Sequence, residues 1–222
     1  MDADDAWYAR HLELLVHAFV TYPKAAMLSN ALVYRWKEED EPLSNAQDNA
    51  DYNYVSFDYI AALGEGAFPI HIGSTMFRRS LIETHYIRFF EHMRLAEDVN
   101  FMLRMSRLGE SLLSSYVGLV YYQEDTESAM KQTSKTAALT PLYFEGMEGE
   151  TWSASEQASI KKFLRREYIK KAYQNRKLAL HTEELSTKIG AGTQQIGRWN
   201  ILPYFVVRYM PEFVYSAYRK YR

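Results

Sequence analysis

The sequence predicts an α/β domain followed by a basic, mainly helical tail. Up to about residue 122, segments with apolar residues at helical spacing alternate with short apolar runs typical of buried strands. The charge balance then reverses: residues 1–157 contain 12 Lys/Arg and 24 Asp/Glu, whereas residues 158–222 contain 14 and 4. A chain of 222 residues with 47% hydrophobic content is large enough to bury a core.

The composition also excludes several kinds of site. The chain has no cysteine, so a disulfide framework, a thiolate metal site and a cysteine nucleophile are all excluded. The N-terminus has no basic region followed by an apolar run, and the apolar stretch at 201–207 is too short to span a bilayer. We therefore expect a cytoplasmic protein.

The first regular elements are predicted from local patterns. Apolar residues recur at helical spacing over 11–20, and Asp4 or Asp5 could cap this helix. Residues 25–34 form an apolar run that predicts a buried strand. The later elements are expected in this order: an exposed polar excursion over 36–53, a loop over 64–69, a strand over 70–77, a helix over 78–88, a helix over 97–108, a strand over 112–122 and a polar loop over 123–134.

Beyond the last strand, the composition predicts a linker and then a basic helix. Glycine, proline and acidic residues between positions 140 and 157 favour a linker. Apolar residues then recur at three- and four-residue steps with Lys and Arg between them, which predicts an amphipathic basic helix. We therefore divide the chain into residues 1–139, a linker over 140–157 and a basic, aromatic tail over 158–222. Such a tail suits an anionic membrane surface or a nucleic acid.

The first acidic cluster lies at the start of the chain. Asp2 and Asp4 place carboxylates at alternate positions, with Asp5 next to them. Carboxylate oxygens are the ligands that Mg²⁺ and Mn²⁺ prefer, and such a metal could hold a diphosphate leaving group. The alternative is that Asp4 or Asp5 only caps the following helix, which is a common role for aspartate.

The second acidic cluster opens the helix predicted over 97–108. Glu97 and Asp98 precede an apolar stretch, and a carboxylate placed there could accept a proton from an attacking hydroxyl. The alternative is again structural, because acidic residues in a first helical turn complement the helix dipole. Arg104 follows on the same helix and could pair with an acid or bind a phosphate, although a lone arginine is usually structural or solvated.

Five short motifs, none of them specific alone, occur together in an order that resembles glycosyltransferase family 2. They read Asp-Ala-Asp-Asp-x-Trp, Ile-Gly-Ser-x-x-Phe-Arg-Arg, Phe-Glu, Glu-Asp-x-x-Phe-x-x-Arg, and paired tyrosines followed by a serine-bearing loop. They occupy residues 2–7, 72–79, 89–91, 97–104 and 121–128. The resemblance covers about residues 1–130 of the chain.

The resemblance implies a GT-A, Rossmann-like fold and a transfer of sugar from a nucleotide-diphosphate donor. By position, Asp2 and Asp4 would match the motif that binds a divalent metal, Mn or Mg, together with the donor diphosphate. Asp98 would match the general base, with Glu97 beside it near the acceptor. Such enzymes are expected to invert the anomeric centre.

Two further residues, Asp5 and Arg104, are expected to contribute to substrate binding. Relative to the family, the first nucleotide-binding half of the fold, on the order of a hundred residues, is expected to be missing ahead of Met1. The sequence is thus interpreted as the C-terminal, truncated portion of such an enzyme, with little activity expected from the chain alone.

The resulting hypothesis is a glycosyltransferase of bacterial surface polysaccharide synthesis that acts on a glycan or lipid-linked acceptor. Its basic tail would rest on the inner face of the cell membrane, and no nucleic-acid partner is expected. The rival hypothesis is a non-catalytic module that binds a membrane surface or a nucleic acid, with both acidic clusters acting only as caps.

Overall fold

A computed structural model describes residues 5–36, 53–67, 70–93, 95–123, 143–147 and 149–174 of the chain. Its strands are β1 (Ala6–Trp7), β2 (Ala25–Trp36), β3 (Tyr54–Phe57), β4 (Thr75–Phe77) and β5 (Glu110–Gln123). Its helices are α1 (His11–Thr21), α2 (Tyr59–Glu65), α3 (Arg79–Thr84), α4 (Glu97–Ser106) and α6 (Ala154–Gln174), with a 3₁₀ turn η1 (Ile72–Ser74). The predicted mixed α/β class is confirmed for this part of the chain.

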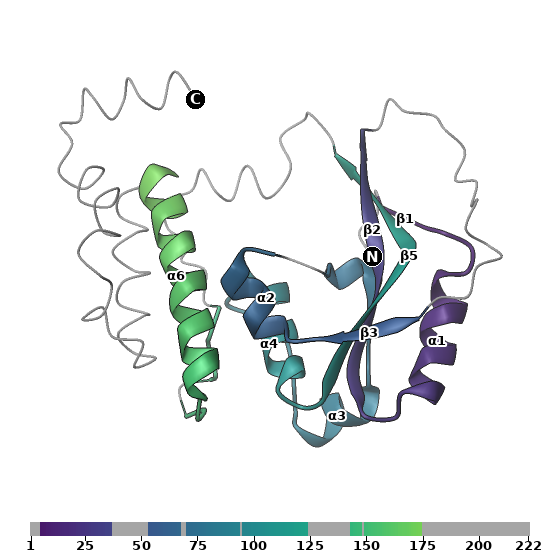
Figure 1. Cartoon of the computed structure of the whole chain (residues 1–222), viewed down its shortest axis with the longest axis horizontal. Helices are drawn as coiled ribbons and strands as arrows, with labels where there is room; N and C mark the ends of the chain where they lie inside the picture. The colour runs from purple at the N-terminus through teal and green to yellow at the C-terminus, as the bar shows by residue number, and fades with distance from the viewer. Residues whose placement is uncertain are drawn as a thin grey trace.

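The sheet is organised around β5, which has hydrogen-bonded neighbours on both edges (Figure 1). One edge pairs with β2 in parallel orientation, and β2 pairs in turn with β4 in antiparallel orientation. The other edge of β5 pairs with β3 near its start and with β1 near its end, both antiparallel. Because β2 and β5 are parallel, the chain between them must cross from one end of the sheet to the other.

A bulge divides β5 into these two halves. Asn30 of β2 is opposite Ser114, but the next residue, Ala31, is opposite Val117. Two residues of β5 therefore have no partner in β2, and the Tyr116 N–H donates instead to Ser114 Oγ at 3.0 Å. Extra residues of this kind bend a strand, and here the bend separates the segment that pairs with β3 from the segment that pairs with β1.

The main core lies between α2, α4 and α6, and it includes the residues expected to form a linker. Ile160 and Phe163 of α6 are fully buried in this cluster, where the Phe163 ring packs edge-on against Tyr143 at 4.8 Å. The aromatic residues of segment 143–152 buried in the same cluster are Tyr143, Phe144 and Trp152. Helix α6 consequently packs alongside α2 as part of the core (Figure 1), while the proposed division of the chain at 139 and 157 stays a prediction.

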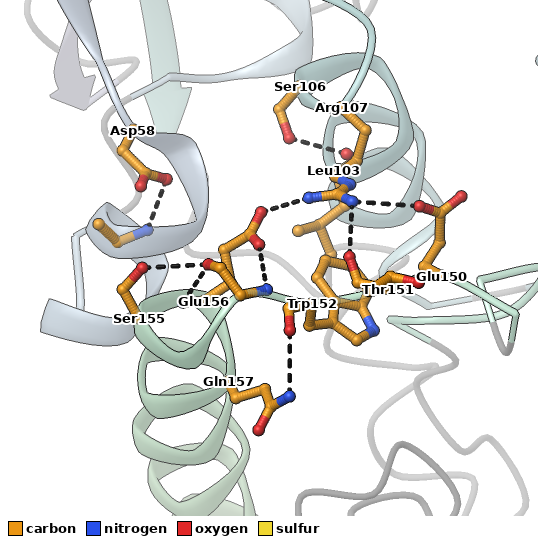
Figure 2. A network of polar contacts seen from close by, with 12 residues as sticks. Asp58, Leu103, Ser106, Arg107, Glu150, Thr151, Trp152, Ser155, Glu156 and Gln157 are labelled. Carbon is orange, nitrogen blue, oxygen red and sulfur yellow. Dashed lines mark hydrogen bonds and ion pairs between the residues drawn. The ribbon is translucent and has the colours of Figure 1, made fainter.

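Arg107, just after α4, ties the start of α6 to this core. Its guanidinium contacts Glu156 and Glu150, and it lies 4.8 Å from the centre of the Trp152 ring (Figure 2). Glu156 also accepts from the Ser153 N–H, and its own N–H donates to Ser153 Oγ. This reciprocal capping box starts α6 at a defined residue.

Three local predictions differ from the structure. Helix α1 begins at His11 after an Arg10 cap, and Asp5 lies buried ahead of β1, so the capping role suggested for Asp5 is wrong. Gly64 and Glu65 belong to the end of α2, whose cap Gly66 has a left-handed φ of 92°, where a loop had been expected. Of the strand predicted over 70–77, only the last three residues form a strand, β4, and η1 occupies Ile72–Ser74.

The remaining predictions either agree with the structure or fall outside it. Helices over 78–88 and 97–108 and strands over 25–34 and 112–122 are confirmed with shifted ends. The polar excursion falls on residues 37–52 and the later polar loop mainly on residues 124–134, all of which lie outside the described residues.

Gly118 in β5 offers a test of this packing. A Cβ atom there would lie 2.1 Å from His11 Nδ1 and 2.7 Å from Asn30 Cβ, so Gly118→Ala must displace buried groups. We expect its free energy of unfolding in urea to fall by about 1–3 kcal/mol. Gly149→Ala is the matched control because nothing lies within 4 Å of its Cβ position, and equal stability of the two variants would contradict the packing described.

Candidate functional site

The start of α4 carries the two acidic residues that the sequence marks as candidates. The cap position is Ala96, a non-glycine residue at a left-handed φ of 62°, and it makes no side-chain cap. Glu97 is exposed, whereas Asp98 is half-buried and its Oδ1 accepts from the Val99 N–H at 2.7 Å. The carboxylates thus complement the dipole at the start of the helix without occupying the cap position.

Two buried tyrosines lie near Asp98 and were not identified from the sequence. Burial, followed by the charge of the Asp98 carboxylate, raises the pKa of Tyr59, the first residue of α2. Burial and then the charge of Glu167 raise the pKa of Tyr143, with a smaller contribution from Asp98. The Tyr143 hydroxyl donates to Glu167 Oε2 at 2.7 Å, but the buried Tyr59 hydroxyl has no hydrogen-bond partner among the described residues.

Glu167 could have been recognised from the sequence. It lies at helical spacing from Ile160, Phe163 and Leu164, so it is a charged residue on the apolar face of a predicted helix. The structure buries it with those residues. Tyr59 and Tyr143 carry no comparable signal, because a tyrosine in an apolar segment is common in any core.

Arg104 serves a different role from the acid pairing considered for it. Its Nε donates to Asn100 Oδ1 at 2.9 Å, and its Nη2 donates to the carbonyl of Arg88. The guanidinium also lies 4.6 Å from the centre of the Phe90 ring. These contacts hold the segment after α3 against α4, and burial lowers the pKa of Arg104. A substrate-binding role for Arg104 stays a prediction.

Ring packing brings the second, third and fourth motif segments together. The Phe101 ring, on α4, packs edge-on against Phe77 of β4 at 5.0 Å. Phe89 stacks on Phe101 with ring centres 4.5 Å apart and an interplanar angle of 13°. One buried side chain of α4 therefore contacts both neighbouring segments.

The described part of the first motif lies against the second motif. Trp7 Nε1 donates to the carbonyl of Gly73 at 2.8 Å, and β1 pairs with β5 through Ala6 and Trp7. Asp5 is buried beside this strand, while Asp2 and Asp4 lie outside the described residues. No three acidic or histidine side chains in the described ranges form a group that could hold a metal, so the metal-binding role of Asp2 and Asp4 stays a prediction.

A polar network fixes the turn that receives Trp7. His71 Nδ1 accepts from the Gly73 N–H at 3.1 Å, and Ser74 Oγ donates to the His71 carbonyl at 3.0 Å. On β2, the hydroxyl of Ser29 lies 3.0 Å from Ser74 Oγ and accepts from Thr75 Oγ1 at 3.1 Å. These hydrogen bonds hold η1 against β2. Because Trp7 donates to Gly73 of η1, the sheet also fixes the position of Trp7.

A second buried network lies on the other side of Trp7. The Trp7 and His11 ring centres are 5.0 Å apart, and His11 Nδ1 lies 3.1 Å from Asn30 Nδ2. Asn30 Oδ1 accepts from the Tyr54 hydroxyl at 2.7 Å. An Asn amide nitrogen only donates, so His11 Nδ1 is the acceptor and carries no proton. Burial lowers the pKa of His11 to about 4.

Comparisons with known proteins add little to this description. No protein-family profile matches the chain, and no curated protein sequence matches it. Among solved structures it is similar to S. aureus TarS residues 1–349, a glycosyltransferase fragment crystallised with UDP, at 14% identity and a TM-score of 0.41. The similarity covers 100% of this chain and 66% of that one, and likeness of this size establishes neither a family nor an activity. No helix in the described residues is long and apolar enough to cross a membrane.

The buried tyrosines predict opposite effects of the same substitution. Tyr59→Phe removes a buried hydroxyl without a partner, so the free energy of unfolding in urea should rise by about 1 kcal/mol. Tyr143→Phe removes the hydrogen-bond donor to buried Glu167, so the free energy of unfolding of this variant should fall by about 1–3 kcal/mol. If both variants were destabilised equally, the Tyr59 hydroxyl would have a partner in solution.

The buried His11 predicts a dependence of stability on pH. Its pKa is about 4 in the folded chain and about 6.5 when unfolded, so only the unfolded chain takes up this proton between these values. Stability is therefore complete above pH 6.5 and should fall by about 2 kcal/mol between pH 7 and pH 5. Urea unfolding at both pH values measures this loss. His11→Gln should lack most of the loss and His85→Gln, an exposed site, should keep it; equal losses in both would exclude His11 as the source.

Proposed function

We propose that the chain is part of a glycosyltransferase that moves a sugar from a nucleotide-diphosphate donor to a glycan or lipid-linked acceptor. The observation that carries the proposal is a series of contacts that links four motif segments: the first to the second, and the second and third to α4. Trp7 bonds to Gly73, while Phe101 contacts both Phe77 and Phe89. Motifs that are far apart in the sequence are thus neighbours in the fold, as one active site would require.

Asp98 has the environment that a general base needs. It is half-buried at the start of α4, and no lysine, arginine or histidine of the described residues forms an ion pair with it. A carboxylate without a cationic partner remains free to accept a proton. The nearby Tyr59 hydroxyl is a further polar group whose hydrogen-bonding capacity the fold leaves unused.

In the proposed reaction, an acceptor hydroxyl attacks the anomeric carbon of the donor sugar. The new oxygen–carbon bond forms as the bond from that carbon to the diphosphate oxygen breaks, and the electron pair leaves with the nucleoside diphosphate. The hydroxyl proton passes to Asp98, and the anomeric configuration is inverted. A divalent metal, if held by Asp2 and Asp4, would supply positive charge to the leaving diphosphate.

The proposed setting is bacterial surface polysaccharide synthesis at the cytoplasmic face of the membrane. The described part of the tail does not itself supply a membrane-binding face, because Ile160, Phe163 and Leu164 of α6 are buried in the core. Two of its cations are also used within the fold. Lys162 pairs with Glu65 at 2.7 Å, and Arg166 donates to backbone carbonyls at the end of α2. These contacts disfavour docking through the described part of α6, while residues 175–222 of the tail lie outside the described residues.

The donor site can be tested by calorimetric titration of the chain with UDP and Mn²⁺. The proposal expects binding that requires the metal and is abolished in the Asp2→Ala/Asp4→Ala double variant. UDP binding that persists unchanged in this variant would reject the assigned metal site. A folded chain that does not bind UDP would show that this chain alone lacks a donor site.

The general base can be tested by Asp98→Asn. Because the amide cannot accept the acceptor proton, donor turnover should fall about 10²–10⁴-fold while UDP affinity stays within about twofold. Asp58→Asn is the matched control: Asp58 caps α2 by accepting from the Ala61 N–H, a role that asparagine also performs. Turnover that survived in the Asp98 variant, measured as released UDP, would reject Asp98 as the general base.

A further inference from the structure

The segment between α3 and α4 exposes two aromatic side chains. We call residues 85–93 the aromatic loop. Tyr86 is 82% exposed and Phe89 is 50% exposed, although large apolar rings gain free energy from burial. Scattered exposed aromatics are ordinary, so these two become informative only through their geometry.

The backbone around the aromatic loop is strained. Tyr86 has φ 50° and Ala96 has φ 62°, and these are the non-glycine residues of the described chain with positive φ. Both conformations cost free energy for a residue with a Cβ atom, and such residues concentrate at ligand sites. One lies within the aromatic loop and the other directly precedes Glu97 and Asp98.

Phe89 is held rigidly in spite of its exposure. One face of its ring stacks on buried Phe101, and Phe101 is supported by Phe77. The carbonyl of the preceding residue, Arg88, accepts from Arg104. The outer face of Phe89 is therefore a flat apolar surface whose orientation is fixed by α4.

This surface lies near Asp98. Phe101 follows Asp98 by three residues, so both project from the same side of α4. Helical side chains lean toward the helix N-terminus, which brings the Phe101 ring over the turn that contains Asp98. Phe89 stacks on that ring, so it lies on the side of α4 that carries Asp98.

The charges around Phe89 restrict what could bind there. Glu91 lies within the aromatic loop and Glu97 follows it; both are exposed, and Asp98 is half-buried at the helix start. Within the aromatic loop itself, residues 85–93, Arg88 is the one lysine or arginine; it is exposed, and its Nη1 donates to the Ile87 carbonyl. An excess of carboxylates disfavours phosphates and anionic lipids, but carboxylate oxygens accept hydrogen bonds from neutral polyols.

We propose that the outer face of Phe89 is a stacking platform for a pyranose ring of the acceptor, which places one of its hydroxyls toward Asp98. The C–H groups on one face of a pyranose are weakly positive and pack on the negative face of an aromatic ring. The ring hydroxyls remain free to donate to Glu97 and Asp98. This inference rests on the proposed glycosyl transfer and identifies the acceptor side of that site as a sugar ring.

Saturation-transfer NMR on the whole chain tests the platform. The probes are methyl β-D-glucopyranoside, which has axial C–H groups on both ring faces, and glycerol, a polyol without a ring face. Saturation should reach the glucoside C–H protons and not glycerol. Phe89→Ala should weaken glucoside binding about tenfold, while Phe89→Tyr retains it. Val55→Ala, which alters an exposed apolar residue on β3, should leave it unchanged.

Thermal unfolding of each variant distinguishes a loss of binding from a loss of folding. Because Phe89 is half-exposed, we expect the Phe89→Ala variant to remain folded. No saturation of the glucoside by the unmodified chain, or equal saturation by Phe89→Ala, would overturn the platform.

Titration with UDP and Mn²⁺ separates this result from the proposed function. Glucoside binding that requires Phe89 without UDP binding would support the platform and count against the donor site. UDP binding together with a glucoside signal that does not depend on Phe89 would support the donor site and overturn the platform.

Discussion

Parallel pairing of β2 with β5 constrains the arrangement of the rest of the described chain. Parallel neighbours cannot be joined by a tight turn, so the connection between β2 and β5 has to cross from one end of the sheet to the other. That crossover contains β3, β4 and α2 to α4, and hence the second, third and fourth motif segments. On the outer sides of this central pair, β1 pairs with β5 and β4 pairs with β2, both in antiparallel orientation. These motif segments are brought together because the crossover has to return to β5.

Aromatic packing gives this crossover a fixed shape where regular structure is sparse. Between α3 and α4 the described residues, 85–93 and 95–96, form no helix or strand, yet Phe89 and Phe90 are held by Phe101 and Arg104. Rings contribute large contact areas with few rotatable bonds, so a small number of them can order a loop. The same principle operates at the other end of the site, where Trp7 combines a ring contact with a hydrogen bond to Gly73.

Most buried polar groups of the described residues are paired, and the Tyr59 hydroxyl and Arg107 Nε are among the exceptions. Buried Asn30 and Asn100 bond to groups from several elements, and Glu167 accepts from Tyr143. Near the start of α4, in contrast, the Tyr59 hydroxyl has no partner in the part of the chain that the structure describes, and Asp98 accepts a short hydrogen bond from the next residue of its own helix. Buried polar groups are normally paired because an unpaired one costs free energy. The exception beside Asp98 is what a site that receives a polar ligand would show.

Several features of the protein were determined by sequence alone. The helix at 97–106, the strands within 25–36 and 110–123, and the place of Glu97 and Asp98 at a helix start all follow from local periodicity and residue type. These signals are local, since each depends on residues within one or two turns or pleats of the chain. The order of the five motifs could also be recognised in the sequence. Asp2 and Asp4 of the first motif lie outside the described residues.

Other features were decided only by tertiary structure, because they depend on which distant surfaces meet. Segment 143–153 has the composition of a linker, but its aromatic residues fill the gap between α4 and α6. Asp5 has the pattern of a helix cap, but pairing of Ala6 and Trp7 with β5 places it ahead of a strand. Arg104, Tyr59 and Phe89 acquire their contacts only when α2, α4 and the aromatic loop pack together. Long-range burial outweighs local propensity at these positions, since a buried aromatic contributes more free energy than one cap or turn preference.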